Sequence, residues 1–133
     1  MIFIDTGPFL ARYNRRDSYH DECRSLWAKL EKQRQPLVTS NFVIDELLTL
    51  LGRRAGYGFA AQTGQVLYSS QSLRVLRPEE RDEHRALALF KKFADQLVSF
   101  TDCISFALME RHRAEVAFTL DGHFADAGFR RFG

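Results

Sequence analysis

Short, mainly apolar segments recur along the chain and are predicted to be β-strands, and the first of them is continuously apolar. The first covers residues 2–4, and others lie at residues 37–39, 73–76 and 116–120, with an edge strand expected around 129–132. A run without polar alternation is typical of a strand whose two faces are both covered, as in a parallel sheet flanked by helices.

The longer segments between these runs carry apolar residues at helical spacing. Helices are predicted at residues 19–33, 41–51, 59–70, 78–95 and 101–109, with a short one near Pro8. Pro8 suits a first helical position, Ser40 or Asn41 can cap the helix at 41–51, and Thr101 is expected to cap the last helix. A break is expected at 52–58. Strands that alternate with helices predict an α/β domain with a mainly parallel sheet.

The composition narrows the class of protein. A chain of 133 residues with 45% hydrophobic and 27% charged residues is expected to form a single domain over residues 1–133. No apolar run approaches the ~20 residues that span a bilayer, and the first run is broken at Asp5, so we expect a cytoplasmic protein without a signal peptide. Cys23 and Cys103 form no metal-type cluster and are expected to be reduced core residues. The net charge of +2 hints only weakly at an anionic partner.

Four acidic residues occupy comparable places in the predicted elements. Asp5 and Asp121 each follow a strand, Asp102 lies in the first turn of a helix, and Glu46 has apolar neighbours on its helix. Each alone has an ordinary explanation as a turn former, a helix-dipole partner or a solvated side chain. Strand-end residues of a parallel sheet meet at one edge, however. We therefore expect the four acids to converge, which their spacing alone leaves open.

Clustered carboxylates repel one another strongly unless a cation lies between them. Oxygen ligands without a Cys/His cluster suit a hard cation, Mg²⁺ or Mn²⁺. Such a site clamps phosphate oxygens, activates water and stabilises an in-line displacement. The chemistry indicated by the residues is hydrolysis of a phosphodiester bond.

At these residues the chain resembles the PIN-domain nucleases, and most closely the toxin-type, VapC-like members of toxin–antitoxin pairs. The resemblance covers nearly the whole chain and rests on four segments in order, FIDTGPF, TSNFVIDELLTLL, FTDCISFALM and TLDGHF. It implies a Rossmann-like, three-layer α/β/α fold. It further implies that Asp5 and Asp102 are the core metal ligands, that Glu46 shares the metal or orients its water, and that Asp121 completes the pocket.

The resemblance carries further expectations about neighbours and partners. Thr6 and Thr119 would orient the acids by hydrogen bonds. The protein would be an Mg²⁺- or Mn²⁺-dependent endoribonuclease that forms a homodimer and is held by a small antitoxin. Helical spacing does not choose between Asp45 and Glu46, whereas the family pattern of an acid before a Leu-rich run favours Glu46. Asp126 could be a fifth acid near the pocket, although a solvated helix-end position is expected.

The residues also allow other interpretations. His123, near Asp121, could touch substrate, but a packed or surface histidine is the more ordinary expectation. A phosphatase that forms an aspartyl-phosphate needs a second Asp two residues after the first, where this chain has Gly7. Response-regulator receivers have a late lysine, and this chain has none after Lys92. A non-catalytic RNA- or protein-binding module and a stand-alone RNA-processing nuclease both stay open.

Overall fold

A sheet of five parallel strands runs through the computed structural model of the protein, which describes residues 1–133. In chain order the elements are β1 (Ile2–Ile4), α1 (Thr6–Tyr13), α2 (His20–Lys32), β2 (Leu37–Ser40), α3 (Asn41–Ala55), α4 (Tyr57–Ser69), β3 (Leu73–Leu76), α5 (Glu80–Lys92), the 3₁₀ helix η1 (Ala94–Gln96), α6 (Phe100–His112), β4 (Val116–Phe118), α7 (His123–Asp126) and β5 (Arg130–Arg131). The strands lie in the order β3-β2-β1-β4-β5, and every neighbouring pair is parallel. The predicted α/β class with a mainly parallel sheet is confirmed.

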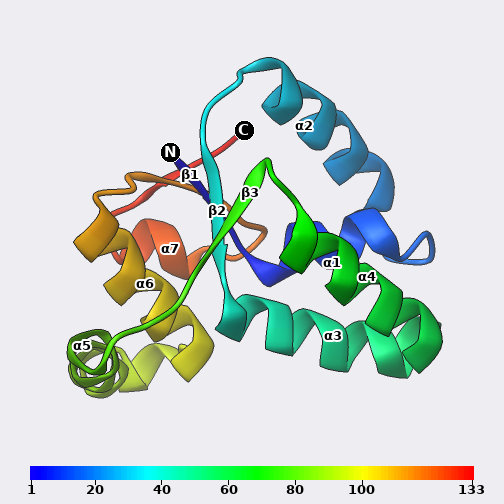
Figure 1. Cartoon of the computed structure of the whole chain (residues 1–133). Coiled ribbons are helices and arrows are strands. Elements are labelled where there is room, and N and C mark those ends of the chain that lie inside the picture. Colours follow the sequence, from blue (N-terminus) through cyan, green and yellow to red (C-terminus); the bar gives the residue numbers. More distant parts are fainter.

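The helices cover both faces of the sheet. Figure 1 shows α1 to α4 on one side of the strands and α5 to α7 on the other. The strand order explains this division, because the chain moves from β1 outward to β3 and then returns to place β4 and β5 on the opposite side of β1. Right-handed crossovers in opposite directions put their helices on opposite faces. The result is the three-layer α/β/α arrangement that the resemblance implied.

The neighbouring strands β1 and β4 are apolar throughout because both of their faces are covered. All three residues of β1 are buried, and β1 pairs with β4 from Ile2 opposite Val116 to Ile4 opposite Phe118. Phe124 of α7 is fully buried, with its ring centroid 6.4 Å from that of Phe3 and 4.9 Å from that of Phe106 on α6. These contacts fix α7, and with it the turn that follows β4, against the core.

Several predicted boundaries are wrong by a few residues. Helix α1 begins at Thr6, so Pro8 is its third residue, a place that tolerates proline because N–H groups of the first turn have no partner within the helix. The cap of α6 is Ser99, whose Oγ accepts from the backbone N–H of Asp102, and Thr101 is already helical. The break expected at 52–58 narrows to Gly56, whose φ of 99° favours glycine.

Two further differences concern the ends of elements. The strand expected over 116–120 ends at Phe118, and Leu120 lines the cleft described below. The helix expected to reach residue 95 ends at Lys92 and is followed by η1 and by Leu97 in a left-handed conformation. None of the helices combines the length and the apolar character that crossing a membrane would require.

Candidate metal centre

A cleft opens at the carboxyl ends of β1 and β4, the two neighbouring strands from which the chain departs to opposite faces of the sheet. This switch point is where open α/β sheets bind ligands. The cleft has a volume of about 400 Å³. Its lining contains all four predicted acids, and it comprises Asp5, Thr6, Gly7, Leu10, Glu46, Leu50, Leu97, Ser99, Asp102, Leu120, Asp121 and His123.

Asp5 is buried in this cleft directly after β1, with 5% of its surface exposed. It occupies the N-cap position of α1, yet its carboxylate makes no capping hydrogen bond to that helix. Its Oδ2 instead accepts a hydrogen bond of 2.8 Å from the Thr119 hydroxyl. The ordinary role of a strand-end Asp as a helix cap therefore does not explain why Asp5 is there.

Thr119 connects the two acids that follow the central strands. Its Oγ1 donates to Asp5 and accepts from the backbone N–H of Asp121 at 3.0 Å, so one buried hydroxyl fixes both positions. The orienting role expected of Thr119 stays a prediction, and these two contacts are the ones that it requires. Thr6 differs, because its Oγ1 is buried in the cleft wall without a hydrogen-bond partner.

Asp102 reaches the cleft from the other face of the sheet, in the first turn of α6. It is 7% exposed, and its place in the helix is set by the Ser99 cap. The signal for that cap is present in the sequence, since Ser99 and Asp102 have the spacing of a capping box. The prediction of Thr101 missed it because both hydroxyl residues precede the same apolar run.

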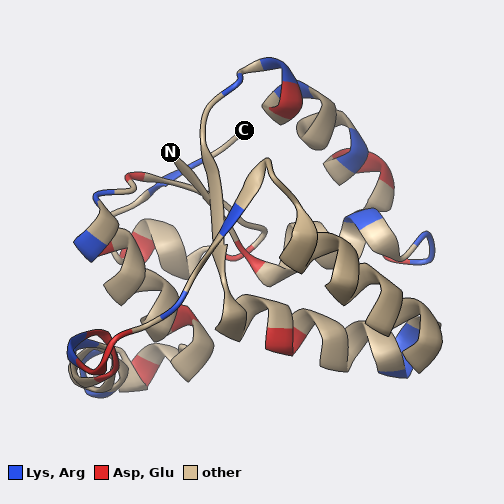
Figure 2. Ribbon diagram, in the orientation of Figure 1, with Lys and Arg blue, Asp and Glu red and all other residues tan.

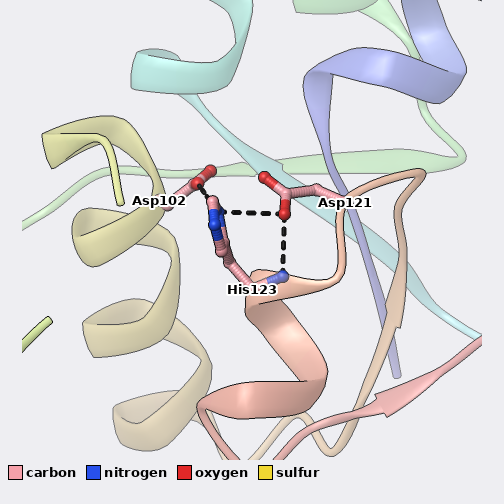
Figure 3. A group of neighbouring side chains, drawn as sticks. All are labelled: Asp102, Asp121 and His123. Atoms are coloured by element: carbon pink, nitrogen blue, oxygen red, sulfur yellow. Dashed lines mark hydrogen bonds and ion pairs between the residues drawn. The ribbon is translucent and has the colours of Figure 1, made fainter. Parts of the chain in front are cut away.

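Asp121, on the turn between β4 and α7, lies next to His123, the first residue of α7. Asp121 Oδ1 accepts a 2.7 Å hydrogen bond from the backbone N–H of His123, and the His123 Nδ1 atom lies 3.0 Å from the same oxygen. Nδ1 is also 3.6 Å from Oδ2 of Asp102. Figure 3 shows the histidine ring between the two carboxylates. One carboxylate oxygen from each acid and a ring nitrogen all lie within 4.8 Å of one another.

The remaining candidate acids differ in whether they line the cleft. Glu46 of α3 is half-buried and lines the cleft, whereas Asp45 is exposed and lies outside the lining. Asp126 is exposed at the end of α7 and is also outside the lining. The cleft thus contains the four predicted acids, Asp5, Glu46, Asp102 and Asp121. It also contains His123, which was not in the predicted set.

Comparison with known proteins places this arrangement in a family. The PIN domain family matches the chain over residues 2–130. The protein belongs to the PIN domain family. The resemblance to PIN domains of the VapC type, based on four sequence segments, is confirmed.

Two relatives extend this comparison. The chain is 35% identical over 130 residues to VapC20 of Mycobacterium tuberculosis, named a 23S rRNA-specific endonuclease, and the match covers 97% of this chain and 95% of that protein. The crystal structure of VapC20, described as a Sarcin-Ricin loop cleaving toxin, superposes with a TM-score of 0.87 at 32% identity over 97% and 96% of the two chains. VapBC2 from Rickettsia felis, solved bound to a DNA fragment from its promoter, shares the fold with a TM-score of 0.68 at 13% identity, over 98% and 97% of the chains.

The buried acids of this PIN domain are difficult to ionise. Desolvation by burial raises the pKa of Asp5 from 3.8 to about 6; the Thr119 hydrogen bond opposes this rise, and the charges of Glu46 and Asp121 add to it. Desolvation also raises the pKa of Asp102 far above the usual carboxyl range, and the neighbouring charge of Asp5 adds to the effect. Burial and mutual repulsion therefore make the ionised form of both acids less favourable than in water, and a positive charge placed beside them would relieve this cost.

The donor set of this PIN domain fits a divalent cation. No lysine or arginine lines the cleft, so its four carboxylates have no fixed cationic partner there. Figure 2 shows Lys and Arg in several separate places instead, among them α2, the loop before it and the far end of α3. Convergent carboxylate oxygens without a cationic side chain are the ligands that Mg²⁺ and Mn²⁺ prefer.

Proposed function

We propose that this PIN domain is a metal-dependent endoribonuclease and the toxin of a type II toxin–antitoxin pair. The observation that carries the proposal is the convergence of four carboxylates, two of them buried with raised pKa values, in a cleft that lacks lysine and arginine. The full-length similarity to VapC20, named a 23S rRNA-specific endonuclease, supports RNA as the substrate. It also makes the sarcin–ricin loop of 23S rRNA the first target to test.

We assign each residue of the cleft a role according to its position. Asp5 and Asp102, the two buried acids, would hold Mg²⁺ or Mn²⁺, and Asp121 would complete the pocket. A cation bound there supplies Lewis-acid stabilisation of phosphate oxygens and a more acidic water. Glu46, half-buried on α3, would orient the attacking water or share the metal. Thr119 would keep the carboxylate of Asp5 aimed into the cleft through their hydrogen bond.

The proposed partners follow from the same assignment. A toxin of this type would be held inactive in the cytoplasm by a small antitoxin, and we propose a homodimer as its active form. Support comes from similarity to a chain described as a toxin. Size-exclusion chromatography with light scattering tests the dimer, and co-purification with the product of a neighbouring short reading frame tests the antitoxin.

The deciding experiment is cleavage of a synthetic sarcin–ricin loop RNA and of a mixed RNA pool by pure protein, in EDTA, Mg²⁺ or Mn²⁺. We expect cutting only with a metal, loss of cutting in Asp102→Asn, and full activity in Asp45→Asn. The second variant is a matched control because it removes an exposed acid beside Glu46 that lies outside the cleft. Cutting in EDTA would contradict metal dependence. No cutting by folded, inhibitor-free protein would favour a non-catalytic binding module.

A further inference from the structure

His123 supplies the one side-chain nitrogen in the lining of the acidic cleft. Its Nδ1 atom is shielded from solvent and makes no aligned hydrogen bond, although it lies 3.0 Å from Asp121 Oδ1. Such a buried nitrogen without a hydrogen-bond partner is uncommon in folded proteins and points to a missing partner. Carboxylate oxygens of Asp121 and Asp102 lie 3.0 and 3.6 Å from Nδ1.

The ring is held in place before any ligand arrives. The backbone N–H of His123 is bonded to the carboxylate of Asp121 at 2.7 Å, which ties the first residue of α7 to the acid. The next residue, Phe124, is fully buried between β1 and α6. Nδ1 is therefore positioned by the fold, while about a third of the imidazole side chain stays exposed.

The spacing of the three donor atoms suits a shared cation. Ligands that occupy adjacent corners around an ion, at bonds of about 2.0–2.2 Å, are separated by roughly 3.0 Å in an octahedral site and by roughly 3.5 Å in a tetrahedral one. The two distances from Nδ1 to the carboxylate oxygens are 3.0 and 3.6 Å. One ligand atom from each of the three residues lies within 4.8 Å of the other two, so a single small ion can approach all three side chains.

We propose that His123 Nδ1 is a ligand of the cation held by Asp102 and Asp121, and that this nitrogen makes the site prefer Mn²⁺ over Mg²⁺. The proposal rests on the metal-dependent function proposed above and adds a ligand to its site. Mg²⁺ strongly prefers oxygen ligands, whereas a neutral imidazole binds first-row transition ions readily. A cleft that offered only oxygen ligands would lack this reason to bind Mn²⁺ more tightly than Mg²⁺.

The test measures metal binding and not cleavage. Isothermal titration of the full chain with Mn²⁺ alone and with Mg²⁺ alone gives the ratio of the two affinities. Pulsed electron paramagnetic resonance of the Mn²⁺-loaded protein detects the hyperfine coupling of a directly bound ¹⁴N nucleus. The variants are His123→Asn, which offers an amide oxygen near the position of Nδ1, and His123→Ala. His84→Asn is the matched control, because His84 is exposed on α5 and outside the cleft.

The expected result is a ¹⁴N coupling in wild type and in His84→Asn that is absent from both His123 variants. The preference for Mn²⁺ should fall about tenfold in His123→Asn, while its Mg²⁺ affinity changes much less. An unchanged affinity ratio together with no ¹⁴N coupling in wild type would overturn the role of His123 and leave the proposed nuclease intact. Failure of wild type to bind either ion would overturn the metal-dependent function itself.

Discussion

Replacing Asp5 by Asn should make the metal-free protein more stable at neutral pH while abolishing cleavage. Asn has nearly the same shape, and its amide oxygen can still accept the hydrogen bond from Thr119. The substitution removes only the charge that burial and the neighbouring acids disfavour. Most substitutions at a 5% exposed residue are instead expected to destabilise a protein.

The magnitude follows from the pKa of Asp5, which is raised from 3.8 to about 6 in the folded protein. Between these two values the folded state binds a proton that the unfolded state has lost, so stability falls as the pH rises. A shift of roughly two units corresponds to ~3 kcal/mol. This is an upper limit, because Asp102 ionises more easily once Asp5 is neutral. We expect a gain of about 1–3 kcal/mol at pH 8 and almost none at pH 4, or roughly 5–10 °C in Tm at pH 8.

The assay is urea unfolding of wild type and Asp5→Asn at pH 4 and pH 8, with EDTA present throughout. Asp45→Asn is the control for removal of an acid from a solvent-exposed position, and it should change stability little at either pH. A variant that is less stable than wild type at pH 8 would refute the reasoning. So would an equal gain at both pH values, because it would show that the gain does not come from ionisation.

Further substitutions test the supports of the site. Ser99→Ala should lower stability by about 1 kcal/mol in urea unfolding through loss of the cap of α6, whereas Thr101→Ala should have a smaller effect in the same assay. Thr119→Val should weaken Mn²⁺ binding about tenfold in a calorimetric titration, because the hydroxyl fixes two acids of the cleft. Asp82→Asn should destabilise the protein by about 2–3 kcal/mol at pH 7, because buried Asp82 forms a bidentate pair with Arg111. Burial opposes ionisation of Asp82, but the Arg111 contacts outweigh it and lower its pKa, so this loss should shrink as the pH falls to 3, opposite to the Asp5 trend.

The sequence predicted the strands and the class of fold well because their signal is local. Runs such as residues 2–4 are apolar on both faces, and no helical periodicity competes with them. Boundaries failed where two neighbouring residues offered the same chemistry. Ser99 and Thr101 can both cap a helix, and the choice depends on how the chain enters α6 after Leu97, which adopts a φ of 54°. The capping-box spacing of Ser99 and Asp102 is the sequence signal that favours Ser99, and the prediction of Thr101 overlooked it.

The sequence predicted that the four acids would converge in one cleft, but it did not predict that His123 lines the same cleft. Asp5 and Asp121 follow strands, so the rule for parallel sheets predicted that they meet at one edge. Asp102 and Glu46 were picked out by their apolar neighbours, and the family resemblance supplied their roles. β1 and β4 are neighbours in the sheet although they are far apart in the sequence. The apolar runs do not show which strands pair, so this strand order could not be predicted from them. The position of the His123 ring depends on the docking of α7 through Phe124, so its place in the cleft required the structure.

The location of the acids explains how the fold tolerates them. Repulsion among carboxylates opposes folding, but here it acts at the ends of β1 and β4, strands whose own residues are buried in the core. The apolar core can therefore hold the charges together without rearranging. If the cleft binds a cation as proposed, the carboxylates that destabilise the metal-free protein stabilise the metal-bound protein. The free energy of unfolding then rises by RT ln(1 + [M]/Kd), where [M] is the concentration of the free ion. Stability and activity then depend on the same ion. A variant that removes one of the repelling carboxylates therefore stabilises the metal-free protein but loses a ligand of the cation.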